Sequence, residues 1–432
     1  MQSVNKDLHS DDCGAKLKAM SDTPFTFYRG SNLIYYRDMA EQGTVLKSAF
    51  YDPKATPWIQ GDMHVLNAGR FANDKGTVVY DLNDFDEAFV ANFLYDVYRL
   101  ATSIVLVARN NSMVDDDATS CVKTFAKAYR DQLKLLAEDP KAKPFTYDND
   151  NSPKGLIRDL LKDTKGPEAM RQKMLKKWSL VDPDTKTRRF HTEDNKDLAP
   201  VSGSDRAAIE AAVVDYYMHT VTSRLHKNKE YFQVVDVALR KNAGTGSLGT
   251  SRYYVLIAGE SREDPEDDVI LDVKLQGKPC VYKYLSREQQ AAVDGHVDND
   301  ADRAVRAYKS LLRRSDDHLG YMNIKGLNYS VRERSPYKKA LSLTSDLTVA
   351  DLDSLAEQYG ILLANAHARS DKDNEDLGVP ESFGQLVTDL TRSQRGEFAA
   401  EVADVALSYA IQVEHDYALF RNSMSLGNNR LC

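Results

Sequence analysis

Two neighbouring stretches decide the fold of this chain: GDMHVLN at residues 61–67 and VVYDLNDFDE at residues 78–87. The second stretch begins with a β-branched run and ends in a turn that carries several carboxylates. Carboxylates crowded together repel one another unless a cation lies between them, and hard oxygen ligands of this kind suit Mg²⁺. We therefore predict that Asp84 is a metal ligand, with Asp86 as the second choice. The alternative is a solvated acidic loop.

The first stretch places Asp62 five residues before Asn67. In the catalytic loop of a protein kinase, this spacing joins an Asp that accepts the proton of the attacking hydroxyl to an Asn that holds Mg²⁺. Asp62 is therefore the candidate base, and Asn67 is a candidate catalytic and metal-binding residue. Gly-Asp and Asn-Ala-Gly also form ordinary turns, so a purely structural turn is the alternative.

A glycine-rich segment, GTGSLG at residues 244–249, lies between strand-like runs at residues 231–239 and 252–258. A dinucleotide-binding GxGxxG opens a helix, whereas the glycine-rich loop of a kinase joins two strands and covers the ATP phosphates. The flanking strands favour the second use, and a plain glycine-rich turn is the alternative. The predicted nucleotide-binding residues of this segment are Gly244, Gly246, Ser247 and Gly249.

A lysine interrupts the apolar strand ILDVKL at residues 270–275. If this strand is buried, Lys274 must find a partner or bear the cost of burying its charge. In a kinase the strand lysine pairs with the ATP phosphates and is held by a glutamate on the next helix. We predict this nucleotide-binding role for Lys274, with an edge-strand lysine facing water as the alternative. The following helix offers only Glu288, near its start, so the glutamate partner stays open.

The GDxHxxN run and its acidic turn resemble the aminoglycoside and choline phosphotransferases, which have the kinase-like fold. In those enzymes a further Asp follows the metal Asp by twelve residues and opens a helix, and Asp96 has that place here. Gln60 is a departure, because phosphotransferases usually have His at this position. The resemblance implies ATP and Mg²⁺ as cofactors and favours a small-molecule acceptor.

Almost the whole chain is also similar to an uncharacterised, mainly bacterial family, domain of unknown function 2252. The similarity implies no substrate, and Arg306 stands about where that family places an acid. The matching pieces are residues 25–30, 61–67, 80–87, 236–250, 273–274 and 363–370.

A length of 432 residues favours two lobes over one core. We predict an α+β fold of two-lobed, protein-kinase-like architecture. The order of the motifs along the chain is circularly permuted relative to a kinase, because the catalytic and metal motifs precede the glycine-rich segment. The predicted divisions are a flexible N-terminus (1–22), a helical catalytic lobe (23–228, with an insertion at 138–205), a β-rich nucleotide lobe (229–334) and the second part of the helical lobe (335–432).

Helix predictions follow from apolar residues at three- and four-residue spacing. This spacing predicts a helix over residues 93–109, and one long helix is predicted over residues 287–314. A further helix is predicted over residues 398–420. If the order is permuted, this last helix should adjoin the N-terminal segment, because the ends of such a domain lie close together.

The net charge of −8 and the pI near 5.7 argue against a nucleic-acid partner. The chain contains neither an apolar run of about 20 residues, as a membrane span requires, nor the apolar core of a secretory signal. The four cysteines are far apart and form no CxxC pair, which predicts free thiols rather than a zinc site or a disulfide framework. We therefore predict a cytoplasmic protein without membrane partners, and the oligomeric state stays open.

The leading hypothesis is an Mg²⁺-ATP-dependent phosphotransferase that acts on an unidentified acceptor. The alternatives are transfer of AMP by the same fold and a nucleotide-binding pseudokinase or scaffold. A phosphatase of the haloacid dehalogenase type is disfavoured, because Ala88 stands where its motif requires Thr or Val. Candidates for an anionic substrate site are Arg29, His64, His367 and Arg369, with helix capping as the alternative for the last two.

Overall fold

The structure is a computed structural model of the whole chain. It describes residues 10–139, 141–151, 153–193, 195–221, 224–241, 251–261, 264–370, 382–392 and 395–425. No helix within these ranges combines the length and the apolar character that a bilayer crossing requires.

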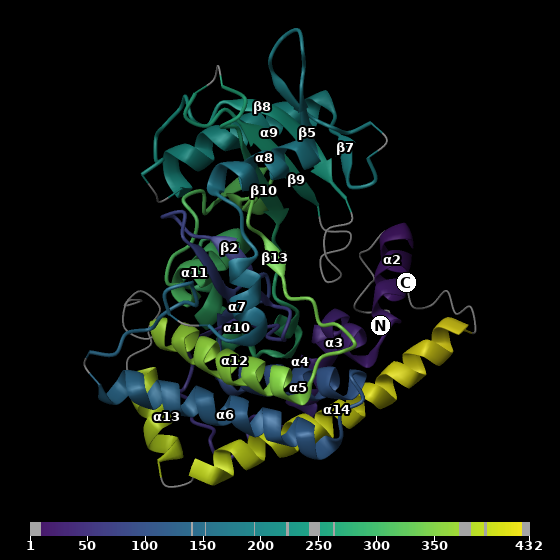
Figure 1. Cartoon of the computed structure of the whole chain (residues 1–432), viewed down its shortest axis with the longest axis vertical. Coiled ribbons are helices and arrows are strands. Elements are labelled where there is room, and N and C mark those ends of the chain that lie inside the picture. Colours follow the sequence, from purple (N-terminus) through teal and green to yellow (C-terminus); the bar gives the residue numbers. More distant parts are fainter. Residues whose placement is uncertain are drawn as a thin grey trace.

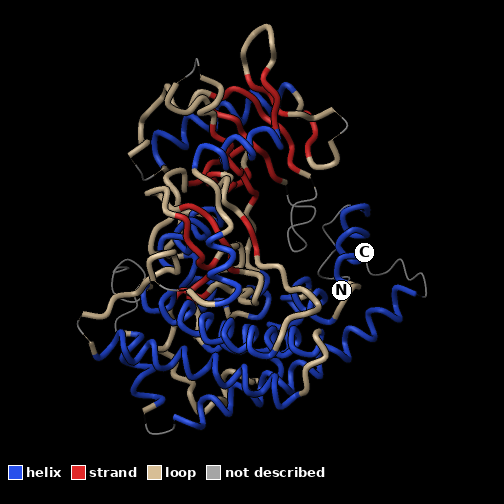
Figure 2. Tube along the Cα trace, viewed as in Figure 1, coloured by secondary structure: helices blue, strands red, loops and turns tan. Residues whose placement is uncertain are grey.

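A six-stranded antiparallel sheet lies at one end of the long axis of the molecule (Figures 1 and 2). Its strand order is β11-β12-β10-β9-β8-β7, so strands that follow one another in the sequence from β7 to β10 are also neighbours in space. The strands are β7 (Leu198–Pro200), β8 (Val234–Arg240), β9 (Arg252–Ile257), β10 (Val269–Leu275), β11 (Gly320–Ile324) and β12 (Leu327–Glu333).

Alternating side chains of this sheet enter two separate apolar clusters, as the two-residue period of a strand requires. On β9, Val255 and Ile257 face one cluster, and Tyr254 and Leu256 face the other. The first face is covered by α9 (Gly203–Asp215) and a π-helical turn, η1 (Tyr216–Thr220). The second face is covered by α8 (Pro167–Trp178).

The long helices pack together at the opposite end of the molecule (Figure 1). They enclose the largest apolar cluster, which also takes in the buried residues of the short strands beside them. The helices of this part are α2 (Ser10–Met20), α3 (Pro24–Gly30), α4 (Asn32–Gln42), α5 (Leu94–Asn110), α6 (Asp115–Glu138), α7 (Gly155–Lys162), α12 (Val349–Arg369), α13 (Phe383–Thr391) and α14 (Arg395–Ser425).

Short strands and two further helices lie between these two regions. Strands β2 (Ala68–Ala72) and β3 (Val78–Leu82) form a hairpin that β13 (Lys339–Ala340) joins. Also here are β1 (Trp58–Ile59), β4 (Phe89–Val90), a 3₁₀ turn η2 (Cys280–Tyr284), α10 (Arg287–Asp294) and α11 (Asp300–Leu311). The paired strands β5 (Ser179–Val181) and β6 (Arg188–Phe190) lie instead beside the six-stranded sheet, where Phe190 joins the apolar cluster of α8.

The α+β class and the predicted helix over residues 93–109 are confirmed, the latter as α5. The single long helix over residues 287–314 is wrong, because the chain forms α10 and α11 instead. Gly295 ends the first helix, and the Asn299 side chain accepts hydrogen bonds from the backbone N–H groups of Ala301 and Asp302. An Asn in this capping position starts a new helix, so the apolar spacing continues across a real break.

The segment over residues 138–205, which we predicted as an insertion, packs against the sheet through α8 and β7. Its residues Met174, Leu175 and Trp178 on α8 are buried, and its strand β7 pairs with β8. Burial of these apolar side chains explains why a stretch rich in Lys, Asp and Pro is ordered.

The N-terminal helices adjoin α14, as predicted. The rings of Phe27 and Phe420 have centroids 5.2 Å apart, and the Tyr417 hydroxyl donates to the carbonyl of Ser21 at 2.7 Å. Among the described cysteines, Cys13 is disulfide-bonded whereas Cys121 and Cys280 are free. The expectation of free thiols throughout is therefore wrong for Cys13.

Candidate functional site

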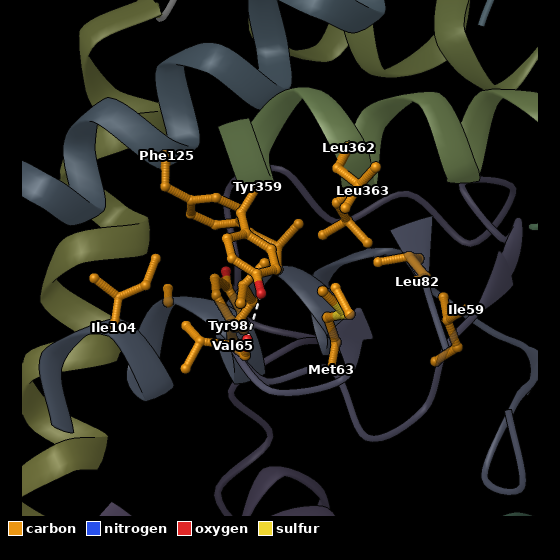
Figure 3. Packing of buried hydrophobic residues seen from close by; sticks show 14 of the residues in the cluster. Ile59, Met63, Val65, Leu82, Tyr98, Ile104, Phe125, Tyr359, Leu362 and Leu363 are labelled. Carbon is orange, nitrogen blue, oxygen red and sulfur yellow. Dashed lines mark hydrogen bonds between the residues drawn. The ribbon is translucent and has the colours of Figure 1, made fainter. Parts of the chain in front are cut away.

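The loop at residues 61–67 is held in place by its apolar residues. Met63 and Val65 are fully buried against the helical core, where the Tyr359 hydroxyl of α12 donates to the carbonyl of Val65 (Figure 3). Asp62 directly precedes this anchored segment, and Asn67 follows Val65 by two residues. The apolar residues between the two polar ones therefore set the position of both.

A buried carboxylate fixes the start of the same loop. Asp96, in the first turn of α5, accepts hydrogen bonds from the backbone N–H groups of Gln60 at 2.6 Å and Gly61 at 3.0 Å. Gly61 has a φ of +81°, and a Cβ at this position would lie 2.0 Å from the carbonyl oxygen of Glu87. Only glycine fits this left-handed, closely packed turn. Asp96, the aspartate twelve residues after Asp84, thus supports the start of this loop.

Asp62 forms an ion pair with Arg99, one turn further along α5. The Arg99 Nε donates to Asp62 Oδ1 at 2.7 Å, and its Nη2 donates to the same oxygen. The Arg99 side chain is fully buried and lies over the rings of Tyr28 and Tyr35 at 4.3 and 4.9 Å. Asn67 completes the loop, because its Nδ2 donates to the carbonyl of Asp62 at 2.8 Å.

Burial and Arg99 act on the Asp62 carboxyl in opposite directions. Burial raises its pKa, the Arg99 guanidinium lowers it, and the balance leaves the pKa at about 7. This is well above the ordinary value for an aspartate. A carboxyl with a pKa near neutrality suits an acid or base that exchanges a proton during a reaction.

The raised pKa of Asp62 predicts a pH-dependent stability. Its folded-state pKa of about 7 lies above the ordinary pKa of 3.8 for an aspartate, so its stabilising contribution is fully present below the lower value. That contribution is lost as the pH rises through the folded-state pKa. Thermal melts of wild type and Asp62→Asn should therefore show the variant gaining relative to wild type between about pH 4 and about pH 7. The exposed control Asp159→Asn should follow wild type at every pH, and a constant difference for Asp62→Asn would contradict the assignment.

Lys274 of β10 reaches across from the sheet to the acidic turn after β3. Its Nζ lies 3.3 Å from Asp84 Oδ1 and also donates to Asp86 Oδ2. Gln276, two residues along the strand, donates to Asp86 Oδ1 at 2.9 Å. These residues are about 190 positions apart in the sequence. The partner of Lys274 is therefore the pair of predicted metal ligands, and no glutamate of the described residues pairs with it.

Lys274 is nearly buried in this ion pair, whereas the side chains of Asp84 and Asp86 are 48% and 29% exposed. Lys274 holds the pKa of Asp84 far below its usual range. Burial alone would lower the pKa of Lys274, but the carboxylates of Asp84 and Asp86 outweigh this effect and raise it. Asp84 also has a φ of +60°, an uncommon conformation for a residue other than glycine. Backbone strain of this kind is found at functional sites.

Gln60 joins the two loops that carry the acidic residues. Its Oε1 accepts from the backbone N–H of Asp62 at 2.8 Å, and its Nε2 donates to the carbonyls of Asn83 at 3.2 Å and Asp84 at 2.6 Å. Gln60 is completely buried. The amide provides an acceptor and a donor at once, so this departure from the phosphotransferase pattern still fixes the two loops relative to each other.

Arg303 of α11 holds the other side of the acidic turn. It is fully buried and donates to the carbonyls of Ala88, of Asp86 at 2.7 Å and of Gly277 at 3.0 Å. Arg306, one turn away, instead pairs with Asp302 of its own helix at 2.7 Å. Glu288 lies in the first turn of α10 and is exposed. Neither residue contributes to the site.

Of the four candidates for an anionic substrate, only Arg29 lines a cavity beside Asp62. His64 is buried, and burial lowers its pKa well below the ordinary value, so it is neutral. His367 contacts the Tyr129 hydroxyl at 2.8 Å and Asp96 at 3.4 Å, and Arg369 donates to the carbonyls of Leu311 and Phe145. The last two are therefore buried supports of neighbouring elements.

The predicted phosphate-binding residues Gly244, Gly246, Ser247 and Gly249 lie outside the described residues. The strands that flank them, β8 and β9, are adjacent and antiparallel. No group of three or more His, Cys, Asp or Glu side chains within the described ranges is arranged to hold a metal. Mg²⁺ bound with a nucleotide takes only one or two carboxylates from the protein, with the phosphates and water as the other ligands. Asp84 and Asn67 fit that requirement.

Sequence reasoning missed Arg99 and Arg303 as site residues. A signal was present for Arg99, because it interrupts the largely apolar helix predicted over residues 93–109. Arg99 lies three residues after Asp96 on α5, so both side chains point to the same side of the helix. The sequence does not predict the partner of either arginine, because each partner lies on another element.

The fold and the site define an α+β protein with a sheet at one end and a helical region at the other. Lys274 of the sheet is nearly buried and contacts the carboxylates of Asp84 and Asp86 between these regions. The chain belongs to the family described as "Uncharacterized protein conserved in bacteria (DUF2252)", whose model matches residues 10–423. Comparisons with curated proteins and with solved structures found no match.

Proposed function

We propose that the protein is an Mg²⁺-ATP-dependent phosphotransferase with a kinase-like architecture in circularly permuted order. The observation that carries the proposal is the contact of Lys274 with Asp84 and Asp86. A lysine from the sheet and two carboxylates from the helical region meet where a nucleotide with its metal would need both. Asp62 and Asn67 lie on the loop that Gln60 joins to this turn.

The strand order of the sheet supports the proposal. Counted from β8, the glycine-rich segment joins the first and second strands, Lys274 lies on the third, and two helices follow before β11. A kinase likewise has its glycine-rich loop over the phosphates and its lysine on the third strand, followed by a helix. Adjacent antiparallel strands on both sides of the glycines also argue against a dinucleotide-binding fingerprint, which leads into a helix.

The packing of the N-terminal helices on α14 supports the permuted order. A kinase has its glycine-rich segment and lysine before the catalytic and metal loops, whereas here the order along the chain is Asp62, Asp84, the glycines and Lys274. In a domain permuted in this way, the segments at its present ends were continuous in the unpermuted order, so they should lie side by side. Phe27 and Phe420 are in contact, which meets that expectation.

Each residue has a defined role in the proposed reaction. Lys274 orients the phosphates, and Asn67 and Asp84, with Asp86 beside them, hold the metal. Mg²⁺ neutralises the charge that develops on the phosphate oxygens. Asp62 accepts the proton of the attacking hydroxyl, and Arg99 orients Asp62. Most of the rate enhancement then comes from positioning and charge stabilisation.

A nucleotide-binding scaffold without phosphotransfer is the second candidate. The observation in its favour is that Lys274 pairs with the carboxylates instead of a helix glutamate, as it would in an inactive arrangement. The two candidates share nucleotide binding and differ in turnover. Transfer of AMP would use the same groups, with the nucleotide bound in the opposite orientation.

Nucleotide binding is tested by thermal melts with and without Mg²⁺-ATP. At a ligand excess of 100 Kd, linkage stabilises the folded state by about 2.7 kcal/mol, a shift of roughly a few degrees for a protein of this size. Lys274→Met should lose most of this shift because it removes the ammonium that pairs with the phosphates. The control Lys278→Met, at an exposed lysine three positions beyond the strand, should keep it. No shift in the folded wild-type protein at millimolar Mg²⁺-ATP would refute the proposal.

A further inference from the structure

A cavity of about 210 Å³ adjoins the loop that carries Asp62. The proposed nucleotide site leaves this cavity free. It is smaller than the pockets of about 300 to 1,000 Å³ that take drug-sized ligands. Residues from α2, α3, α4 and both acidic loops line it. The charged side chains at its wall are Lys16, Arg29, Asp62, Asp84, Asp86 and Glu87.

The four carboxylates of the cavity already have partners. Asp62 binds Arg99, and Asp84 and Asp86 bind Lys274. Glu87 accepts a hydrogen bond from the backbone N–H of Cys280 at 2.7 Å. These acids therefore do not provide close partners for the two basic side chains.

Lys16 and Arg29 have no such partners. Lys16 is only 6% exposed, and no carboxylate of the described residues lies within ion-pair distance of it or of Arg29. The Arg29 Nε is buried and donates no hydrogen bond to any described residue. Burial lowers the pKa of both side chains, which reports the cost of keeping them charged. Asp62, Asp84 and Glu87 act on these two cations only from beyond ion-pair distance, so burial still dominates, and an anion in direct contact with both would offset its cost.

A third polar group in the cavity lacks a partner. Asn32 donates through Nδ2 to the carbonyl of Gly61 at 3.0 Å, but its buried Oδ1 accepts no hydrogen bond from the described residues. This oxygen is fixed beside the loop that carries Asp62. An acceptor in this place suits a hydroxyl group. The cavity thus offers two donors for an anion and one acceptor for a hydroxyl.

The basic pair is rigidly placed by the turn between α2 and α3. Met20 packs directly on Gly30, where a Cβ would lie 2.5 Å from its side chain. Thr23 and Thr26 form a reciprocal capping box at the start of α3. The carbonyl of Ser21 is held by the hydroxyl of Tyr417 from α14. Lys16 and Arg29 therefore belong to a preformed wall.

We propose that this cavity binds the acceptor, and that the acceptor is a small hydroxylated anion whose phosphate or carboxylate group is bound by Lys16 and Arg29. The inference rests on the proposed phosphotransfer. The acceptor hydroxyl oxygen attacks the γ-phosphorus of ATP, and the bond from that phosphorus to the β–γ bridging oxygen breaks. The hydroxyl proton passes to Asp62, and ADP leaves with the electron pair of the broken bond.

Binding of three related probes to the full-length protein tests the anion site. Glycerol 3-phosphate and glycerate carry the two anionic groups, and glycerol is their neutral counterpart. We expect calorimetric titration to detect at least one of the anions at millimolar concentration and to detect no glycerol. Lys16→Gln and Arg29→Gln should each weaken anion binding by about tenfold or more, the usual loss for a charge-assisted hydrogen bond. Lys18→Gln, at an exposed lysine on the same helix, should bind as wild type, and Arg29→Lys should recover part of the affinity.

Thermal shifts with Mg²⁺-ATP on the same variants separate this inference from the proposed function. Unchanged shifts in Lys16→Gln and Arg29→Gln support the acceptor site. Loss of the nucleotide shift together with anion binding would assign both cations to the triphosphate and overturn the inference alone. Failure of both anions to bind would also overturn it. Anion binding in a protein that shows no nucleotide shift would refute the proposed function and leave the anion site standing.

Discussion

Asp84→Asn should abolish turnover and weaken Mg²⁺-ATP binding, which is the largest functional effect that we expect. The substitution removes a charged oxygen ligand from a hard cation. It also removes one of the two carboxylates that Lys274 contacts. Asparagine tolerates the positive φ of Asp84 better than most residues, so the backbone of the turn is preserved. The loss therefore reports the missing charge.

Asp62→Asn provides the contrast, because Asp62 faces the acceptor and not the nucleotide. Its amide oxygen still accepts from Arg99, so the loop keeps its position. Nucleotide binding should be nearly intact, whereas phosphotransfer should fall by about 10²–10⁴, the range for a positioned base. In a scaffold protein, Asp84→Asn would still weaken binding, but Asp62→Asn would change nothing measurable.

The experiment compares slow ATP hydrolysis without acceptor in wild type, both variants and Asp159→Asn, an exposed control on α7. The enzymatic proposal expects wild-type rates in the control and none in Asp84→Asn. Equal background rates in all four proteins would contradict it. Nucleotide affinity is measured in parallel, so that loss of binding and loss of chemistry are separated.

Arg303→Leu should destabilise the protein more than any other single substitution considered. The arginine is fully buried and satisfies the carbonyls of Asp86, Ala88 and Gly277. Leucine fills part of the volume but leaves these carbonyls without a donor, at about 1–3 kcal/mol each. The effects are not additive, and we expect a total loss of about 3–5 kcal/mol.

Urea denaturation measures this loss through the transition midpoint and its slope. Arg287→Leu, the same substitution at an exposed arginine of α10, should change stability by less than about 0.5 kcal/mol. Because Arg303 holds the acidic turn, the Mg²⁺-ATP shift of the surviving folded protein should fall as well. A midpoint equal to that of the control would show that the carbonyls find other donors.

The sequence by itself determined the local elements and the two loops. Apolar runs rich in β-branched and aromatic residues predicted β9 and β10, and the apolar spacing over residues 93–109 predicted α5, because these are short-range patterns. The five-residue spacing of Asp62 and Asn67 also survives in the structure as a direct hydrogen bond. The break between α10 and α11 was missed because the capping Asn299 interrupts the backbone without interrupting the apolar pattern.

Only the tertiary structure decided which charges meet. Lys274 pairs with Asp84 and Asp86, and Asp62 pairs with Arg99, because packing of separate elements brings these side chains within hydrogen-bond distance. A buried charge must be compensated, but the sequence does not say from which element the partner comes. Lys16 has no ion-pair partner among the described residues, and the sequence does not show this either. A lysine on a short polar helix is expected to be solvated until α2 packs beside the loop that carries Asp62.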